Sequence, residues 1–314
     1  LQQPILTVAK SAVTGGGDTV IDAGELVTYT VDITNSGDAP AYDPLLVDTI
    51  PQGLRNGAAT ITMLSTSFVI AGVALPDVTP VYDPVTGVAS WNFDTGAADA
   101  YSIAAGETLR VVYQVQADAD LGADLTLTNA ALVQNYYSFD NDAVPTLGGV
   151  DGVREIYGPS NTASVTLTSA GATALDKQAT VATATIGEPF TYRILVPAAP
   201  QNTALYDVRI LDDLTPPASA ADMAFVSVAA VGGPYTWTPV NTGSATSVVI
   251  EDTVNGIDIP AGDQIEIEIT VVLTDTSPPN EPAWYSIIRP PIPITAITVI
   301  RARRATGWVT PART

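Results

Sequence analysis

The chain has 314 residues, a length that predicts two domains at roughly one domain per 150 residues. Its formal net charge of -21 excludes a nucleic-acid partner, because phosphate recognition needs clustered Lys and Arg. Cysteine and histidine are both absent, so the sequence offers no disulfide, no Ser-His or Cys-His nucleophile and none of the usual zinc sites.

Segments typical of β-strands follow one another along the chain, with Gly, Pro, Asn and Asp between them. They alternate apolar and polar residues or are rich in β-branched residues, and they cover 26–33, 43–50, 108–117, 124–133, 161–168, 189–196, 206–214, 246–252 and 264–273. No segment shows a long helical period. The pattern predicts an all-β chain of two tandem Ig-like β-sandwich domains, the second incomplete at its C-terminus.

A unit of the first half returns in the second half. Residues 24–53 read GELVTYTVDITNSGDAPAYDPLLVDTIPQG, and residues 187–216 read GEPFTYRILVPAAPQNTALYDVRILDDLTP. A second match pairs IAAGETLRVVYQV at 103–115 with IPAGDQIEIEITV at 259–271, where Ala-Gly-acid predicts a turn before a strand. We therefore expect domains at 1–168 and 175–276, joined by the small-residue linker SAGATA at 169–174.

The character of the chain changes after Thr276. Residues 277–314 are Pro-rich and hold five of the 12 basic residues and one acid. They occupy the place where the second domain should carry its late strand. One hypothesis is a reading-frame shift near 277–283, since a back-translation of the segment from Trp284, read two bases later, permits Val-Phe-Asn-Asn-Thr-Ala-Ser-Tyr-Thr-Tyr-Asn. The alternative is a genuine basic tail that contacts a neighbour or an acidic surface.

The repeated unit resembles a known family. Thr-Tyr-Thr-Val, Thr-Asn-Ser-Gly-Asp and Val-Asp-Thr-Ile-Pro within 24–53 resemble the prokaryotic surface repeat named domain of unknown function eleven. LTNAALVQNYYS (127–138) and YGPSNTASVTL (157–167) are similar to its late strands. The second domain resembles fimbrial isopeptide-formation domains. The resemblance implies an Ig-like spacer in a prokaryotic, extracellular surface protein.

The resemblance also implies a covalent chemistry. In some relatives of the second kind, a Lys on the first strand is joined to an Asn on a late strand, with an Asp or Glu between them. Burial lowers the pKa of the Lys and raises that of the acid, which leaves a neutral amine beside a protonated acid that polarises the amide. The expected residues are Lys10, Asp48 and Asn129 (or, second, Asn161) in domain one, and Lys177 and Asp212, beside Asp213, in domain two.

Each candidate also has a structural interpretation. Lys10 and Lys177 are the only lysines of their domains, yet a Lys that closes a first strand is usually a solvated edge residue. Asp48 also fits a turn residue that caps backbone N–H groups before Pro51.

Two other kinds of site remain open. Calcium takes carboxylate ligands, and the acidic loops offer Asp18, Asp22 and Glu25 in one set and Asp140, Asp142 and Asp151 in another. Exposed aromatics bind glycans, with Tyr136, Tyr137, Trp91 and Trp237 as candidates, although core packing is their commoner role. A carboxylate-pair glycosidase is remote, because the spacing of the acids singles out no pair.

We therefore expect a non-enzymatic structural module of a cell-surface stalk or adhesin, without a cofactor unless calcium binds. Its partners would be neighbouring domains of a longer protein or filament. A nucleic-acid partner is not expected because of the net charge of -21. Insertion into a membrane is not expected because no run of about 18 apolar residues occurs. The alternative is an adhesion module that binds a glycan or a host surface, with or without calcium. Leu1 follows no charged and apolar leader, so we expect a processed end or a fragment.

Overall fold

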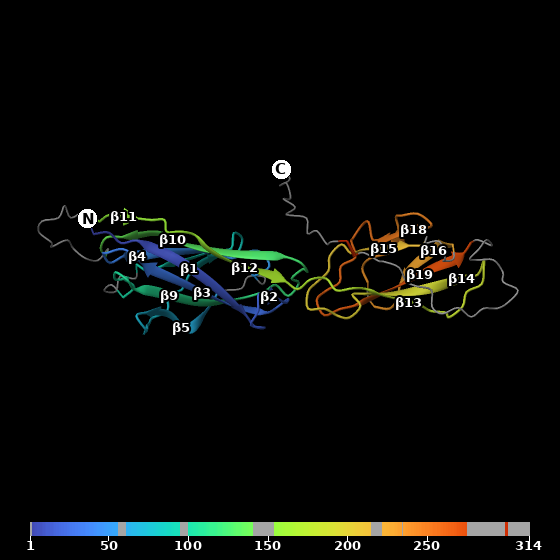
Figure 1. Ribbon diagram of the computed structural model, residues 1–314, viewed down its shortest axis with the longest axis horizontal. Coiled ribbons are helices and arrows are strands. Elements are labelled where there is room, and N and C mark those ends of the chain that lie inside the picture. The colour runs from blue at the N-terminus through green and yellow to red at the C-terminus, as the bar shows by residue number, and fades with distance from the viewer. Residues whose placement is uncertain are drawn as a thin grey trace, which may run out of the picture. The chain divides into compact units, whose positions relative to one another are not determined.

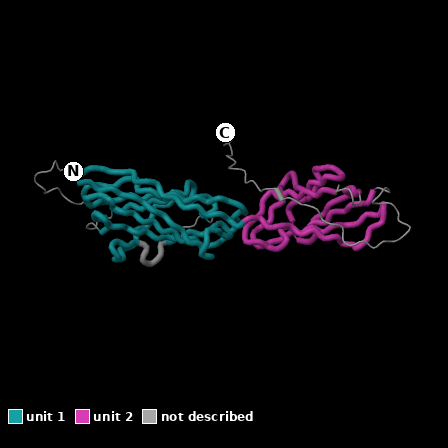
Figure 2. Tube along the Cα trace, in the orientation of Figure 1, with its two compact units in different colours: residues 1–170 teal, residues 171–314 magenta. Residues whose placement is uncertain are grey.

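The computed structural model describes residues 2–55, 61–94, 100–140, 154–214, 222–233, 235–274 and 299–300. For 63–67 and 299–300 it describes the backbone alone. The chain divides into two compact units, residues 1–170 and residues 171–314 (Figure 2). The boundary falls inside the expected linker. Ser169 and Ala170 belong to the first unit, because Ser169 is buried and closes a strand.

The first unit is a β-sandwich of two antiparallel sheets with one parallel pair (Figure 1). One sheet has the order β1-β3-β9-β5-β6, and the other β2-β12-β10-β4-β8-β7 with β11 beside β10. The strands are β1 (Leu6–Thr14), β2 (Val20–Ile21), β3 (Leu26–Asn35), β4 (Tyr42–Thr49), β5 (Thr62–Ile70), β6 (Val73–Leu75), β7 (Val81–Asp83), β8 (Val88–Asn92), β9 (Thr108–Gln116), β10 (Thr126–Tyr137), β11 (Ile156–Tyr157) and β12 (Ala163–Ser169).

The second unit repeats this arrangement over the residues that the structure describes. Its sheets have the orders β13-β14-β19-β16 and β17-β18-β15-β20. The strands are β13 (Asp176–Ala179), β14 (Pro189–Val196), β15 (Arg209–Asp213), β16 (Met223–Ala230), β17 (Val240–Asn241), β18 (Ser247–Glu251), β19 (Ile265–Leu273) and β20 (Val299–Ile300). The order β1-β3-β9-β5 thus recurs as β13-β14-β19-β16, and β10-β4-β8-β7 as β20-β15-β18-β17. This confirms the predicted all-β, tandem sandwich architecture.

The period-2 pattern of each strand places its apolar side chains in the core. In β9, residues 109, 111, 113 and 115 are buried while their neighbours are more exposed, and β19 alternates in the same way. One buried cluster in the first unit joins both sheets and includes Tyr29, Trp91 and Tyr113. Each fully buried large side chain of this kind stabilises the fold by about 1.5–3 kcal/mol through the removal of apolar area from water.

The repeated turns follow the predicted chemistry. Gly106 and Gly262 have φ of 82° and 83°, a region that favours glycine, and the residue after each donates its N–H to the carbonyl two residues before the glycine. Asn35 closes another turn. Its amide donates to the carbonyls of Ala39 and Ile103, at 2.8 Å each, and its Oδ1 accepts from the N–H groups of Ile5 and Gly37.

Residues 277–314 lie outside the described ranges except for Val299–Ile300, so the reading-frame hypothesis stays a prediction. Within the described ranges, no helix is long and apolar enough to cross a membrane.

Candidate cross-linking site

Lys10 lies in the middle of the edge strand β1, paired with Val31 of β3. Its side chain is fully buried, so the interpretation as a solvated edge residue is wrong. Leu6 and Val8 precede it at period 2 and are buried, which places Lys10 on the inward face of the strand. The edge position determines the hydrogen bonding of the backbone, whereas the pleat determines where the side chain points.

Asp48 comes from the opposite sheet, within β4, and is fully buried. Asp48 is therefore a buried strand residue and not a turn residue before Pro51. Lys10 Nζ forms an ion pair with Asp48 Oδ2 across the core. A buried pair of this kind is expensive, because both charges lose their hydration, and so it is weak support for stability and stronger support for a function.

Two further side chains complete the group. Tyr113 of β9 donates its hydroxyl proton to Asp48 Oδ2 at 2.6 Å, and it accepts a hydrogen bond from Lys10 Nζ at 2.9 Å. Asn129 of β10 is fully buried and donates from Nδ2 to the Tyr113 hydroxyl at 3.1 Å. The structure therefore brings Lys10, Asp48 and Asn129 together, with Tyr113 at the centre.

Burial shifts the proton affinities of the pair. It lowers the pKa of Lys10 and raises the pKa of Asp48, and the attraction between the two groups opposes both shifts. Both directions favour the neutral amine and the neutral acid. A neutral amine is nucleophilic, as an acyl transfer to an amide carbon requires.

Aromatic rings surround the amine and exclude water. Lys10 Nζ lies 4.8 Å from the ring centroid of Tyr29 and 5.3 Å from that of Tyr113. Trp91 packs on Tyr113 with a centroid separation of 5.2 Å. Three buried oxygens in this shell, Tyr29 Oη, Asp48 Oδ1 and Asn129 Oδ1, have no hydrogen-bond partner among the described residues. Buried polar atoms without a hydrogen bond are costly, so this group of residues is an unusual one for a sandwich core.

Asn161, the second candidate, lies elsewhere. Its Oδ1 accepts from the N–H of Val8 and its Nδ2 donates to the carbonyl of Val8, both at 2.8 Å. This side chain extends the hydrogen bonding of the β1 edge. None of its hydrogen bonds in the described structure goes to Lys10.

The second unit holds the counterpart of the ion pair. Lys177 Nζ lies 2.6 Å from Asp212 Oδ1, and both side chains are buried. Lys177 also lies over the ring of Tyr192, at 4.4 Å from its centroid. Within the described residues no asparagine joins this pair, and Asp213 is exposed. The order of the sheets and the registers place Lys177, Asp212 and Tyr192 where the first unit has Lys10, Asp48 and Tyr29.

The carboxylates proposed as calcium ligands accept hydrogen bonds from backbone N–H groups of their own loops. Glu25 accepts from the N–H groups of Gly16 and Asp22, and Asp18 accepts from that of Val20. In the described part of the chain, no group of three or more acidic side chains is placed to hold a metal ion. Asp140 is described, whereas Asp142 and Asp151 lie outside the described residues. A calcium site stays an untested prediction.

The aromatic candidates are mostly core residues. Trp91, Tyr136 and Trp237 are buried, and the half-buried Tyr137 lies under the guanidinium of Arg154. These contacts show the core-packing role that is commoner for large aromatic residues.

Sequence reasoning missed Tyr113. A signal was present, because the second internal match aligns Tyr113 with Ile269, an unusual exchange at a buried position. Pattern alone does not reveal that the two strands carrying Tyr113 and Asn129 meet across the core.

The chain matches no known protein-family model, and no curated protein matches it. Solved structures do match. The C-terminal domain of the Streptococcus agalactiae antigen I/II polypeptide BspA has 12% identity and a TM-score of 0.35, over 85% of this chain and 91% of that chain. The major pilin SpaD of Corynebacterium diphtheriae has 13% identity and a TM-score of 0.35, over 83% and 49%. The Actinomyces fimbrial adhesin FimA has 16% identity and a TM-score of 0.34, over 81% and 78%. The resemblance to the prokaryotic surface repeat stays a prediction.

Proposed function

We propose that the chain is a non-enzymatic structural module of an extracellular, prokaryotic surface protein, and that its first unit locks itself with an amide bond between Lys10 and Asn129. The observation that carries the proposal is the fully buried group of Lys10, Asp48 and Asn129. A cross-link of this kind also suits a chain without cysteine that must hold a sandwich together.

The reaction needs only groups already present. Asp48 takes a proton from the ammonium of Lys10, and the neutral amine attacks Cγ of Asn129. The new bond joins Nζ to Cγ, the bond from Cγ to Nδ2 breaks, and ammonia leaves with one further proton from Nζ. Asp48 ends protonated on Oδ2, the oxygen that faces Lys10 Nζ, and is then a neutral acid that can donate a hydrogen bond.

The intact mass of the full chain tests the proposal. We expect a deficit of one ammonia in the parent, retained in Lys177→Ala and absent in Lys10→Ala and Asn129→Ala. Proteolysis followed by mass spectrometry should then yield one peptide that joins the segments of residues 10 and 129.

The two lysine variants are matched controls, because each removes one buried lysine from an equivalent strand. A succinimide at Asn56-Gly57 or Asn255-Gly256 also releases ammonia, but it persists in Lys10→Ala. Full calculated mass in the parent would overturn the cross-link and leave Lys10 as a buried ion-pair residue.

A further inference from the structure

A single hydroxyl oxygen contacts both nitrogens that the reaction exchanges. Lys10 Nζ, which would attack, donates to Tyr113 Oη at 2.9 Å. Asn129 Nδ2, which would depart, donates to the same oxygen at 3.1 Å. The two nitrogens belong to strands of opposite sheets, β1 and β10, so this meeting point exists only in the folded sandwich.

Once Lys10 is neutral, the reaction moves one proton. Nζ must lose a proton to become an amide nitrogen, and Nδ2 must gain one to leave as ammonia. We propose that Tyr113 is a catalytic residue of this cross-linking, whose hydroxyl accepts the proton from Lys10 Nζ and gives its own proton to Asn129 Nδ2. The inference rests on the proposed Lys10–Asn129 reaction and names the group that completes its proton balance.

In the described structure, Asp48 is not positioned to pass a proton to the departing nitrogen of Asn129. Its Oδ2 bonds to Lys10 and Tyr113, its Oδ1 has no partner, and it makes no hydrogen bond to Asn129. Asp48 can therefore receive the first proton from Lys10, but it does not touch the departing nitrogen. The bond from Tyr113 to Asp48 holds the hydroxyl oxygen where it faces both nitrogens. Once Asp48 is protonated, the hydroxyl turns its proton from Asp48 to Asn129 Nδ2, which has become an acceptor because its carbon is tetrahedral.

Tyr113 is also suited to this role by its surroundings. It is fully buried, in contact with the rings of Tyr29 and Trp91, and every hydrogen bond of its hydroxyl goes to a member of the site. Burial raises the pKa of Tyr113 well above its ordinary value, so the phenol keeps its proton until the reaction demands it. A relay within the protein is needed here, because the site is closed to bulk water.

The second unit shows what the site looks like without the relay. Ile269 pairs with Tyr192 as Tyr113 pairs with Tyr29. The Lys177–Asp212 pair thus keeps the two charged members and has an aliphatic side chain at the position of Tyr113. The inference predicts that a lysine in that setting is a poor nucleophile toward an amide.

The test follows the cross-linking rate of the full chain after cell-free synthesis, quenched in acid and read as the fraction that has lost ammonia. We expect Tyr113→Phe to slow the reaction by roughly 100-fold, the lower end of general acid–base catalysis. Tyr29→Phe is the matched control. It removes a hydroxyl from an equally buried ring beside Lys10. That hydroxyl lies near Asn129 without a well-formed hydrogen bond and makes none to Lys10 Nζ, so the rate should fall far less than in Tyr113→Phe.

A second measurement separates chemistry from packing. A fluorinated tyrosine at position 113 changes the acidity of the phenol and keeps its shape and hydrogen bonds, so a relay predicts an altered rate where a packing role predicts none. Hydrogen exchange of the β3 and β9 amides confirms that each variant is folded. A parent that cross-links, with Tyr113→Phe at the same rate, overturns the relay and leaves the cross-link intact. A parent of full mass overturns both.

Discussion

At the scale of the residue, the informative feature is a lysine placed where lysines are rarely found. The Lys10 side chain is fully buried beside Asp48, and isolated charges in such surroundings are too costly to persist unless they are paired or neutralised. Here the Asn129 amide and the Tyr113 phenol complete the buried group, and the proposed cross-link would remove the charge of Lys10. In the second unit, no asparagine and no tyrosine hydroxyl bonds to the corresponding Lys177–Asp212 pair within the described residues.

Burial of the Lys177–Asp212 pair leads to a prediction about the free energy of unfolding of the second unit. Asp212→Leu leaves Lys177 buried without its partner and should lower the free energy of unfolding of the second unit by about 3 kcal/mol, the low end for a broken buried pair because the Lys177 side chain is 8% exposed. The double variant Lys177→Met with Asp212→Leu should return to within about 1 kcal/mol of the parent. Hydrogen exchange of the β14 and β19 amides measures both.

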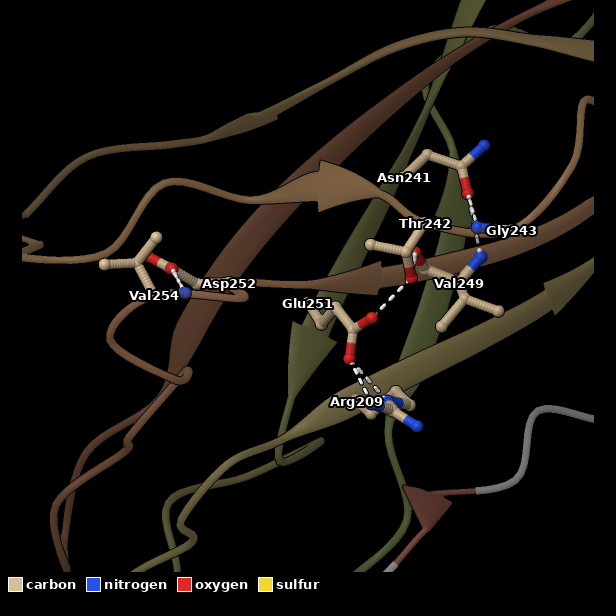
Figure 3. Close-up of polar contacts among 8 residues, drawn as sticks. All are labelled: Arg209, Asn241, Thr242, Gly243, Val249, Glu251, Asp252 and Val254. Carbon is tan, nitrogen blue, oxygen red and sulfur yellow. Dashed lines mark hydrogen bonds and ion pairs between the residues drawn. The ribbon is translucent and has the colours of Figure 1, made fainter.

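An exposed ion pair on the same strand provides the control. Arg209 pairs with Glu251, which also accepts from Thr242 (Figure 3), and the Arg209 side chain is 53% exposed. Glu251→Gln should cost less than about 1 kcal/mol, because solvent screens such pairs. A loss as large as that of Asp212→Leu would show that burial is not the cause.

The hydrogen bonds of Asp252 lead to a prediction about how the stability of the second unit depends on pH. Its carboxylate accepts from the backbone N–H groups of Asn255, Thr238 and Val254 (the last drawn in Figure 3), and these bonds lower its pKa from 3.8 to about 2. Because the folded pKa lies below the unfolded one, the stabilisation is complete above the unfolded value and is lost as the pH falls toward 2.

A carbon NMR titration of the Asp252 carboxyl group should give a midpoint near pH 2. The variant Asp252→Asn should lack this part of the acid dependence of the second unit. A midpoint near the ordinary value would mean that the three backbone bonds do not form in solution.

At the scale of the element, the turns between strands are specified with different strictness. The turn between β5 and β6 is a two-residue loop of Ala71 and Gly72, both with positive φ, as tight hairpins prefer. The turn between β7 and β8 is held by Arg55, whose guanidinium donates to the carbonyls of Val85 and Thr86 while its Nε donates to that of Ile50.

This difference predicts unequal costs for two glycine substitutions. A Cβ on Gly72 meets nothing within 4 Å, so Gly72→Ala should cost about 1 kcal/mol from its φ of 80° alone. A Cβ on Gly87, with φ of 77°, would lie 2.3 Å from both Ile50 O and Arg55 Nη2. Gly87→Ala should therefore cost at least about 2 kcal/mol more, since strain adds to a steric overlap.

Hydrogen exchange of the β4 and β9 amides in each variant measures the two costs. Equal losses for Gly72→Ala and Gly87→Ala would contradict the close packing of the Arg55 turn.

At the scale of the whole molecule, the topology decides what a Lys10–Asn129 bond would do under load. The bond closes a loop that contains β2 to β9 and leaves residues 1–9 and 130–170 outside it. Pulled from its ends, a cross-linked first unit can extend only through those outer segments, roughly 50 residues or roughly 180 Å of chain. The uncross-linked unit of 170 residues extends by roughly 600 Å.

Force spectroscopy of the parent and of Lys10→Ala should show this difference as a short and a long unfolding step. The loop also constrains the unfolded chain, which by analogy with a disulfide across about 100 residues stabilises the unit by about 4–5 kcal/mol. Asn129→Ala serves as the second uncross-linked control. A full-length step in a parent that has lost ammonia would place the cross-link elsewhere.

Much of the architecture could be predicted from the sequence. The expected strands at 26–33, 108–117 and 264–273 lie within a few residues of β3, β9 and β19, because alternation and turn glycines are local properties of a chain. The internal match predicted the equivalent places of Asp48 and Asp212, which both lie in buried strands. The predicted triad of Lys10, Asp48 and Asn129 also meets in the core.

The remainder depended on contacts that no local pattern encodes. Sequence spacing determined two sandwiches, the inward face of each strand and a short set of candidate residues. The tertiary structure placed Asn129, and not Asn161, in the buried group of Lys10 and Asp48. It also showed that the Lys10 side chain is buried although its strand lies at the sheet edge, and it placed Tyr113 between the two nitrogens. The physical reason is that these outcomes depend on which strands pair and on how two sheets face each other, and residues 10, 48, 113 and 129 come together only through that packing.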